Sequence, residues 1–153
     1  MKLNTPLIGV IILMTLTSGC LGSVQDQGKE NGLVVTTDSN LDRIQTVYDQ
    51  GELIDQEDGM IRFDFSESVF VEEILSFGIT PGDGREDIVI EADKAQEIEV
   101  IYNRHGYYTV KAFAIDVNGE RESTEIMITI EQEITWTETN TGNPEIFYFE
   151  ADP

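Results

Sequence analysis

One pair of neighbouring β-rich runs constrains the fold of this chain more than any other feature of its sequence. Residues 106–130 read GYYTVKAFAIDVNGERESTEIMITI, and the two runs meet at Asn118-Gly119. Both residues of this dipeptide tolerate a positive φ, which a tight two-residue turn requires. The sequence therefore predicts a β-hairpin with strands at 107–116 and 125–131, and this hairpin indicates an all-β fold.

Shorter β-rich runs recur before the hairpin, with turn signals between them. Alternation over 60–65 places three large apolar residues on one face of an expected strand: Ile61, Phe63 and Phe65. Further strands are expected at 41–48, 74–79, 88–91 and 97–102. Residues 50–59 are expected to form an acidic, turn-rich passage, and 33–37 either a first short strand or part of a linker. No segment has a convincing amphipathic helical pattern, so the sequence predicts an all-β sandwich.

The two faces of the predicted hairpin differ. Alternation directs one set of side chains to the interior: Tyr108, Val110, Ala112, Ala114, Ile126, Ile128 and Ile130. Tyr108 is expected to bond its hydroxyl to the backbone, as in the tyrosine corners of such sandwiches. The opposite face carries side chains that would be exposed on a sandwich, and we interpret them as a partner-binding patch: Tyr107, Phe113, Ile115 and Met127. Either a partner binds this patch or another part of the chain covers it.

The first residues have the pattern of a targeting segment. Lys2 precedes an apolar run at 7–16, which is too short to span a bilayer comfortably, since a spanning helix takes about 20 residues. The small residues before Cys20 resemble the cleavage box of prokaryotic lipoproteins, which implies a lipid on the Cys20 thiol. The box departs from its usual pattern at Thr17, where an aliphatic residue is common. The alternative is an ordinary signal peptide with an incidental thiol.

These features divide the chain into four segments. Residues 1–19 are expected to be a lipoprotein-type signal peptide, and 20–40 a polar, glycine-containing flexible tether. Residues 41–132 are expected to be the β-sandwich domain, and 133–153 a β-rich C-terminal extension. This extension either packs on the domain, where it would cover the apolar patch, or is a truncated second domain.

Four short motifs occur in order along the expected domain. They are FDFSES at 63–68, ILSF at 74–77 with GDG at 82–84, Tyr102 with GYYTV at 106–110, and DVNG at 116–119. In this order they resemble a PKD domain, an immunoglobulin-like β-sandwich found in many surface proteins, and the resemblance covers roughly residues 41–132. The family usually has a tryptophan shortly before its GDG turn. This chain has none there, so a core aromatic is missing unless Phe77 substitutes for it.

The net charge of the chain disfavours some classes of partner. It has 30 acidic and 9 basic residues, a formal net charge of −21. Such a charge disfavours binding to nucleic acid or anionic lipid through a basic patch. Catalysis has few candidates, because His105 is the only histidine and no G-x-S-x-G nucleophile motif occurs. We therefore expect no enzyme and no organic cofactor, and an enzyme would require a deep pocket around His105.

Calcium is the one metal that the acidic loops suggest. Asp83, Glu86 and Asp87 surround one turn, and a second acidic group lies at 55–58. Calcium prefers several carboxylate and carbonyl oxygens, so Asp83, Glu86 and Asp87 are a candidate site. The alternative is a solvated acidic loop without metal, since neither loop matches the twelve-residue helix-loop-helix pattern.

Together these features predict a non-catalytic module held outside the cytoplasm by an N-terminal lipid. We expect it to act as a binding or spacer module that recognises a surface protein or a glycan, with no nucleic-acid partner. Its affinity is expected to come from the sheet face around Phe113 and Ile115, or from loops at one end of the sandwich. The alternative is a non-catalytic accessory subunit of a secreted hydrolase or transport system.

Overall fold

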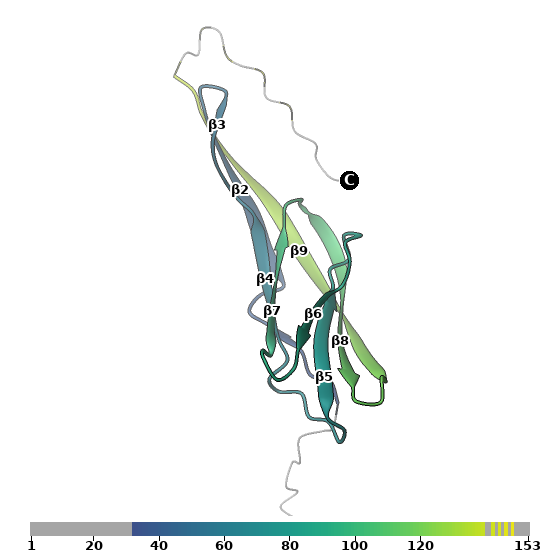
Figure 1. Ribbon diagram of the computed structural model, residues 1–153. Helices are drawn as coiled ribbons and strands as arrows, with labels where there is room; N and C mark the ends of the chain where they lie inside the picture. The colour runs from purple at the N-terminus through teal and green to yellow at the C-terminus, as the bar shows by residue number, and fades with distance from the viewer. Residues whose placement is uncertain (1–31, 140–141, 143, 145, 147, 149–153) are drawn as a thin grey trace, which may run out of the picture.

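The computed structural model describes residues 32–139 and, in the C-terminal segment, 142, 144, 146 and 148. This part of the chain is all-β and contains no helix (Figure 1). Its strands are β1 (Thr36–Thr37), β2 (Leu41–Asp49), β3 (Glu52–Glu57), β4 (Gly59–Asp64), β5 (Ile74–Thr80), β6 (Ile88–Glu91), β7 (Glu97–Tyr102), β8 (Gly106–Asp116) and β9 (Arg121–Thr137).

The strands form two sheets that pack as a sandwich. The smaller sheet has the order β1-β4-β7, and the larger has the order β3-β2-β9-β8-β5-β6. All pairs are antiparallel except β2 with β9, which run parallel from Leu41↔Thr129 to Asp49↔Thr137. The central neighbours β4-β7 and β5-β8-β9 follow the chain order of the B-E and C-F-G strands in immunoglobulin-type sandwiches. The predicted fold class, an all-β sandwich, is confirmed.

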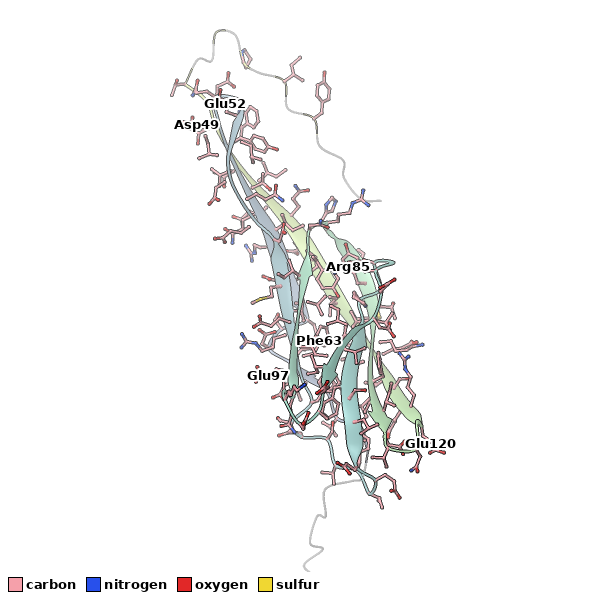
Figure 2. All side chains as sticks on the ribbon, in the orientation of Figure 1. Asp49, Glu52, Phe63, Arg85, Glu97 and Glu120 are labelled. Carbon is pink, nitrogen blue, oxygen red and sulfur yellow. The ribbon has the colours of Figure 1, made fainter. Side chains whose placement is uncertain are left out.

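The core lies between the two sheets. Ile61, Phe63 and Phe65 have no measurable exposure, as alternation in the sequence predicted, and Figure 2 shows Phe63 pointing into the interior from β4. Phe77 is also buried and stacks on Phe65 with 4.7 Å between ring centroids. An aromatic residue thus occupies this part of the core although the chain has no tryptophan near the GDG turn. The predicted inward face of the hairpin is likewise buried or half-buried.

The predicted hairpin is present, but its turn differs from the prediction. Among the described residues that are not glycine, only Gln50 has a positive φ, so Asn118 does not supply one. The Gly119 N–H donates to Asp116 O (3.0 Å) and the Asp116 N–H donates to Glu120 O (3.1 Å), which closes a three-residue loop with Gly119 in the left-handed region. The two-residue turn with two positive φ values is instead Gln50-Gly51, between β2 and β3.

The strands differ from the expected segments in three places. Residues 50–59 are not a turn-rich passage, because β3 pairs with β2 along Glu52–Glu57. Within the expected tether at 20–40, residues 36–37 form β1, which pairs with β4 and agrees with the strand alternative for 33–37; Leu33 and Val35 pack against the core. At the other end, β9 continues without interruption across the expected boundary between 132 and 133.

The larger sheet is longer than the smaller one. In Figure 1, β3 and the adjoining parts of β2 and β9 project beyond the end of the sandwich as a three-stranded layer. We call this layer the ribbon and define it as residues 46–57 and 132–137; the rest of the sandwich is the body. Figure 2 places Asp49 and Glu52 at the tip of the ribbon and Glu120 at the opposite end of the molecule.

Candidate binding cleft

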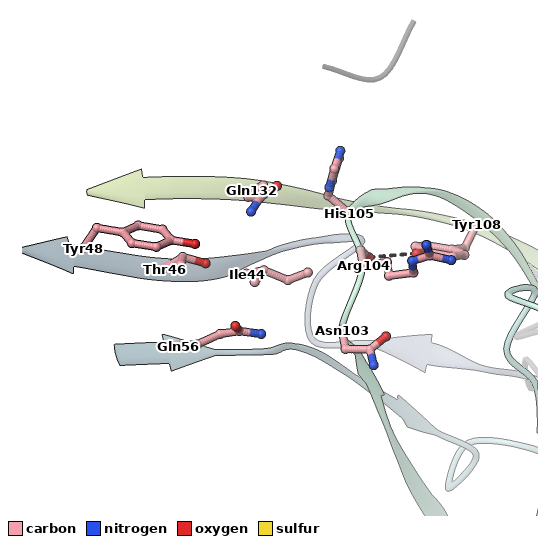
Figure 3. A pocket seen from close by; sticks show the side chains of 9 residues that line it. All are labelled: Ile44, Thr46, Tyr48, Gln56, Asn103, Arg104, His105, Tyr108 and Gln132. Carbon is pink, nitrogen blue, oxygen red and sulfur yellow. Dashed lines mark hydrogen bonds between the residues drawn. The ribbon is translucent and has the colours of Figure 1, made fainter. Parts of the chain in front are cut away.

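A cleft forms where the ribbon leaves the body. The smaller sheet ends at β7, and the chain then passes through the loop 103–105 into β8. Beyond this loop, no second sheet among the described residues covers the inner face of the ribbon, so that face and the loop enclose an open space of about 490 Å³ (Figure 3). Its volume lies in the range of small-molecule binding sites, about 300–1,000 Å³.

Side chains from both sides line this cleft. They are Ile44, Thr46, Tyr48, Gln56 and Gln132 from the ribbon and the adjoining part of β2, and Asn103, Arg104, His105 and Tyr108 from the loop and the start of β8. The floor is made by the two most buried of these residues, Ile44 and Thr46, which are 4% and 5% exposed. The cleft is therefore a polar groove with a closed floor and open sides.

Cross-strand rows shape the inner face of the ribbon. Thr46 lies opposite both Gln56 and Ile134, so these three side chains share a face. Tyr48 lies opposite Trp136 in the next row towards the tip, with 5.2 Å between their ring centroids. This aromatic pair stands at the outer end of the cleft.

The loop wall is fixed by tyrosines of the body. Tyr108 donates its hydroxyl hydrogen to Arg104 O at 2.7 Å, which confirms the predicted tyrosine corner. The Tyr108 ring packs against Tyr102, with 4.7 Å between centroids, and Tyr102 donates to Pro81 O at 3.0 Å. Burial raises the pKa of the Tyr102 hydroxyl, which keeps it protonated as a donor. The position of the loop thus depends on the packed interior.

The lining contains no carboxylate among its described residues, although the chain has 30 acids. Gln56, Asn103 and Gln132 contribute three side-chain amides, each of which both donates and accepts hydrogen bonds. In β9, Gln132 faces the cleft between Glu131 and Glu133, whose positions lie on the other face of the strand. The Gln56 amide donates one hydrogen bond to the Asp58 carboxylate at 3.2 Å and keeps a second N–H and its carbonyl oxygen. The arrangement suits an uncharged ligand with many hydroxyl groups.

The predicted partner-binding patch is formed only in part. Tyr107 and Met127 are 79% and 73% exposed and lie near each other on the outer face of the larger sheet. Ile115 is half-buried, and Phe113 is 1% exposed, so the prediction that Phe113 faces a partner is wrong.

The burial of Phe113 has a local cause. Its ring lies over Gly78, which has no side chain to hold it away. The Arg121 guanidinium covers the other side of the ring, 3.5 Å from its centroid. The C-terminal extension does not provide this cover, because its described part along Ile134 and Trp136 pairs with β2 instead.

The three acids predicted to bind calcium do not gather around one point. Asp83 is paired with Arg85 at 2.6 Å, and Asp87 accepts from the Thr80 hydroxyl at 2.6 Å and lies 3.4 Å from Arg121. Among the described residues no group of three or more potential ligands is placed to hold a metal ion. Since arginines pair with two of the carboxylates, the three acids do not form the candidate calcium site, and the alternative of an acidic loop agrees with their placement.

The remaining predicted site residues are His105 and Cys20. His105 does line the cleft, but the cleft is open and not a deep pocket. Cys20 and the expected signal peptide lie outside the described residues. Within the described part of the chain, no helix has the length and apolar character needed to cross a membrane.

The sequence did contain a signal for the cleft. In both strands that form its ribbon side, an amide stands between two acids, as D-Q-E at 55–57 and E-Q-E at 131–133. Alternation then separates the amide from its acidic neighbours. The pattern at 55–57 indicates a cleft only if this segment is a strand, and the sequence predicts a turn at 50–59.

Comparison with protein-family models and with curated proteins finds no match to this chain.

Proposed function

We propose that this protein is a non-catalytic recognition module, anchored to a membrane through Cys20, that holds the cleft away from the membrane surface. The observation that carries this proposal is the placement of the two ends. The Leu33 N–H donates to Glu122 at 3.0 Å, and Gly32 pairs with Val69, so the chain enters the body beside the β8–β9 turn. The ribbon projects from the opposite end of the body (Figure 1), and the cleft lies at the base of the ribbon.

This geometry favours binding of a target at a distance from the anchor. Residues between Cys20 and Gly32 would extend at most about 40 Å, at roughly 3.5 Å a residue. The elongated body adds to that reach and presents the cleft outward. The resemblance to PKD domains, which occur in many surface proteins, agrees with such a role.

The lining of the cleft supports binding more than catalysis. Its described residues include no serine, cysteine, aspartate or glutamate beside His105. Hydrolysis of glycosides uses a pair of carboxylates, and acyl transfer uses an activated nucleophile. The lining supplies hydrogen-bonding groups that can hold a ligand without transforming it.

Two measurements test the proposal. Mass spectrometry of the membrane fraction should find a lipid-modified Cys20 at the N-terminus of the mature chain. Vesicles that carry the full-length lipidated protein should adhere to the native cell surface, and vesicles without protein should not. An unmodified Cys20 would contradict the anchor, and absence of adhesion would contradict the recognition function.

A further inference from the structure

We propose, on the basis of the recognition function above, that the cleft binds a short stretch of an uncharged glycan chain through the amides of Gln56, Asn103 and Gln132. These amides come from β3, the loop 103–105 and β9, and they meet around one groove (Figure 3). Three segments that are distant in sequence therefore supply the same chemical group to one place.

Amides suit sugar hydroxyls because both groups donate and accept. A side-chain amide offers two N–H donors and a carbonyl acceptor, and a hydroxyl offers one donor and two acceptor lone pairs. The Thr46 hydroxyl on the floor adds the same kind of group. Tyr48 adds an aromatic surface with a polar tip at the outer end of the cleft.

The charges around the cleft favour a neutral ligand. A cation would be expected to contact carboxylates, and none of the described lining residues carries one. An anion could contact Arg104, yet the net charge of −21 repels anions from the molecule as a whole. Arg104 can instead donate hydrogen bonds to neutral hydroxyls.

The polarity of the cleft distinguishes a glycan from a peptide. Protein partners bind mainly through well-packed apolar or aromatic anchors. Among the lining residues that the structure describes, Ile44 is the only aliphatic one, and it is 4% exposed, so the cleft offers little aliphatic surface to such an anchor. The groove is open at its sides, which allows a chain longer than the cleft to pass through it.

The test measures binding of sugars to the full-length protein in detergent solution. The probes are short oligosaccharides of glucose, galactose, mannose or N-acetylglucosamine, and uronic-acid oligosaccharides of equal length. At least one neutral probe should bind, and the Asn103→Ala/Gln132→Ala double variant should bind it about tenfold more weakly, or about 1.4 kcal/mol.

Gln45→Ala is the matched control, because Gln45 is an exposed glutamine of β2 whose strand position faces away from the cleft. Its affinity should stay within about twofold of the unaltered protein. The glycan inference is overturned if no neutral probe binds, if only the uronic-acid probes bind, or if the control loses as much affinity as the double variant.

Adhesion of the vesicles separates this inference from the proposed function. Periodate, which oxidises the vicinal diols of sugars, should abolish adhesion to the treated cell surface. If adhesion persists after periodate treatment, the module recognises a protein and the glycan inference is wrong while the proposed function stands. If a neutral probe binds the cleft but vesicles do not adhere, the glycan inference stands and the proposed function fails.

Discussion

β2 and β9 run through both the body and the ribbon, and their surroundings change along their length. In the body, Ile44, Ile128 and Ile130 are at most 4% exposed beneath the smaller sheet. In the ribbon, every residue of β3 is exposed, and the residues of β9 are exposed or half-buried. The same two strands are thus stabilised by two packed layers in one region and by one layer in the other.

The body and the ribbon are stabilised by different interactions. Burial of apolar surface is the main source of folding free energy, and the body holds almost all of it. The ribbon depends on backbone pairing and on cross-strand contacts such as Tyr48 with Trp136. A single layer leaves its inner face accessible, and that is where the cleft lies.

Truncating a large side chain in each region gives the largest contrast. Phe63→Ala removes a ring with no exposure from the core and should reduce the free energy of unfolding by about 3–5 kcal/mol. Leu53→Ala in the ribbon, where Leu53 is 53% exposed, should change it by about 0.5 kcal/mol or less. Equal losses in chemical denaturation would show that body and ribbon do not differ.

A methyl group at Gly78 tests how closely the outer face of the body is packed. A Cβ at this position would lie within 2.7 Å of Phe113 Cε1, so Gly78→Ala should destabilise the fold by about 1–3 kcal/mol. Adding Phe113→Val should recover part of that loss, because it removes the clashing ring. Independent, additive effects of the two changes in thermal unfolding would contradict the contact.

Tyr108→Phe tests whether the packed interior of the body fixes the loop that forms one wall of the cleft. It removes the hydroxyl that donates to Arg104 O and should cost about 0.5–1.5 kcal/mol of stability. It should also weaken ligand binding, since it releases the loop 103–105. Tyr107→Phe is the control, because Tyr107 is 79% exposed, and it should leave stability nearly unchanged. A similar loss for both variants would show that the corner bond is unimportant.

The contribution of the turn at Asp64 to stability should depend on pH. The Ser66 N–H donates to Asp64 at 2.8 Å, and this bond and the Ser66 hydroxyl lower the pKa of the Asp64 carboxyl. A lowered folded-state pKa adds stability above the unfolded value of about 3.9, and this stability is lost as the pH falls through the folded-state value. Asp64→Asn keeps a turn acceptor and should lessen the fall of the melting temperature below about pH 4. An unchanged acid dependence would contradict this role.

Sequence patterns predicted the body better than the ribbon. Ile61, Phe63 and Phe65 alternate strictly because one face of β4 is buried, so their positions were apparent from the sequence. β3 has no buried face, and its acids favour a turn over a strand. Its conformation depends on pairing with β2, which a local pattern does not record.

The same limit applies to the candidate site. The burial of Phe113 depends on Gly78, which lies in the neighbouring strand β5, and on Arg121, which lies beyond the β8–β9 turn. Alternation alone predicted an exposed ring. The cleft depends on the different lengths of the two sheets, and no single segment encodes that difference.

Hydrogen exchange of the vesicle-anchored, full-length protein tests the central claim most directly. In the presence of native cell-surface material, amides at 52–57, 103–105 and 132–136 should gain protection, while those at 123–127 on the outer side of the β8–β9 hairpin should not change. Protection confined to 123–127 would place recognition on the outer face of the body. Unchanged exchange throughout the chain would contradict a recognition role for the cleft.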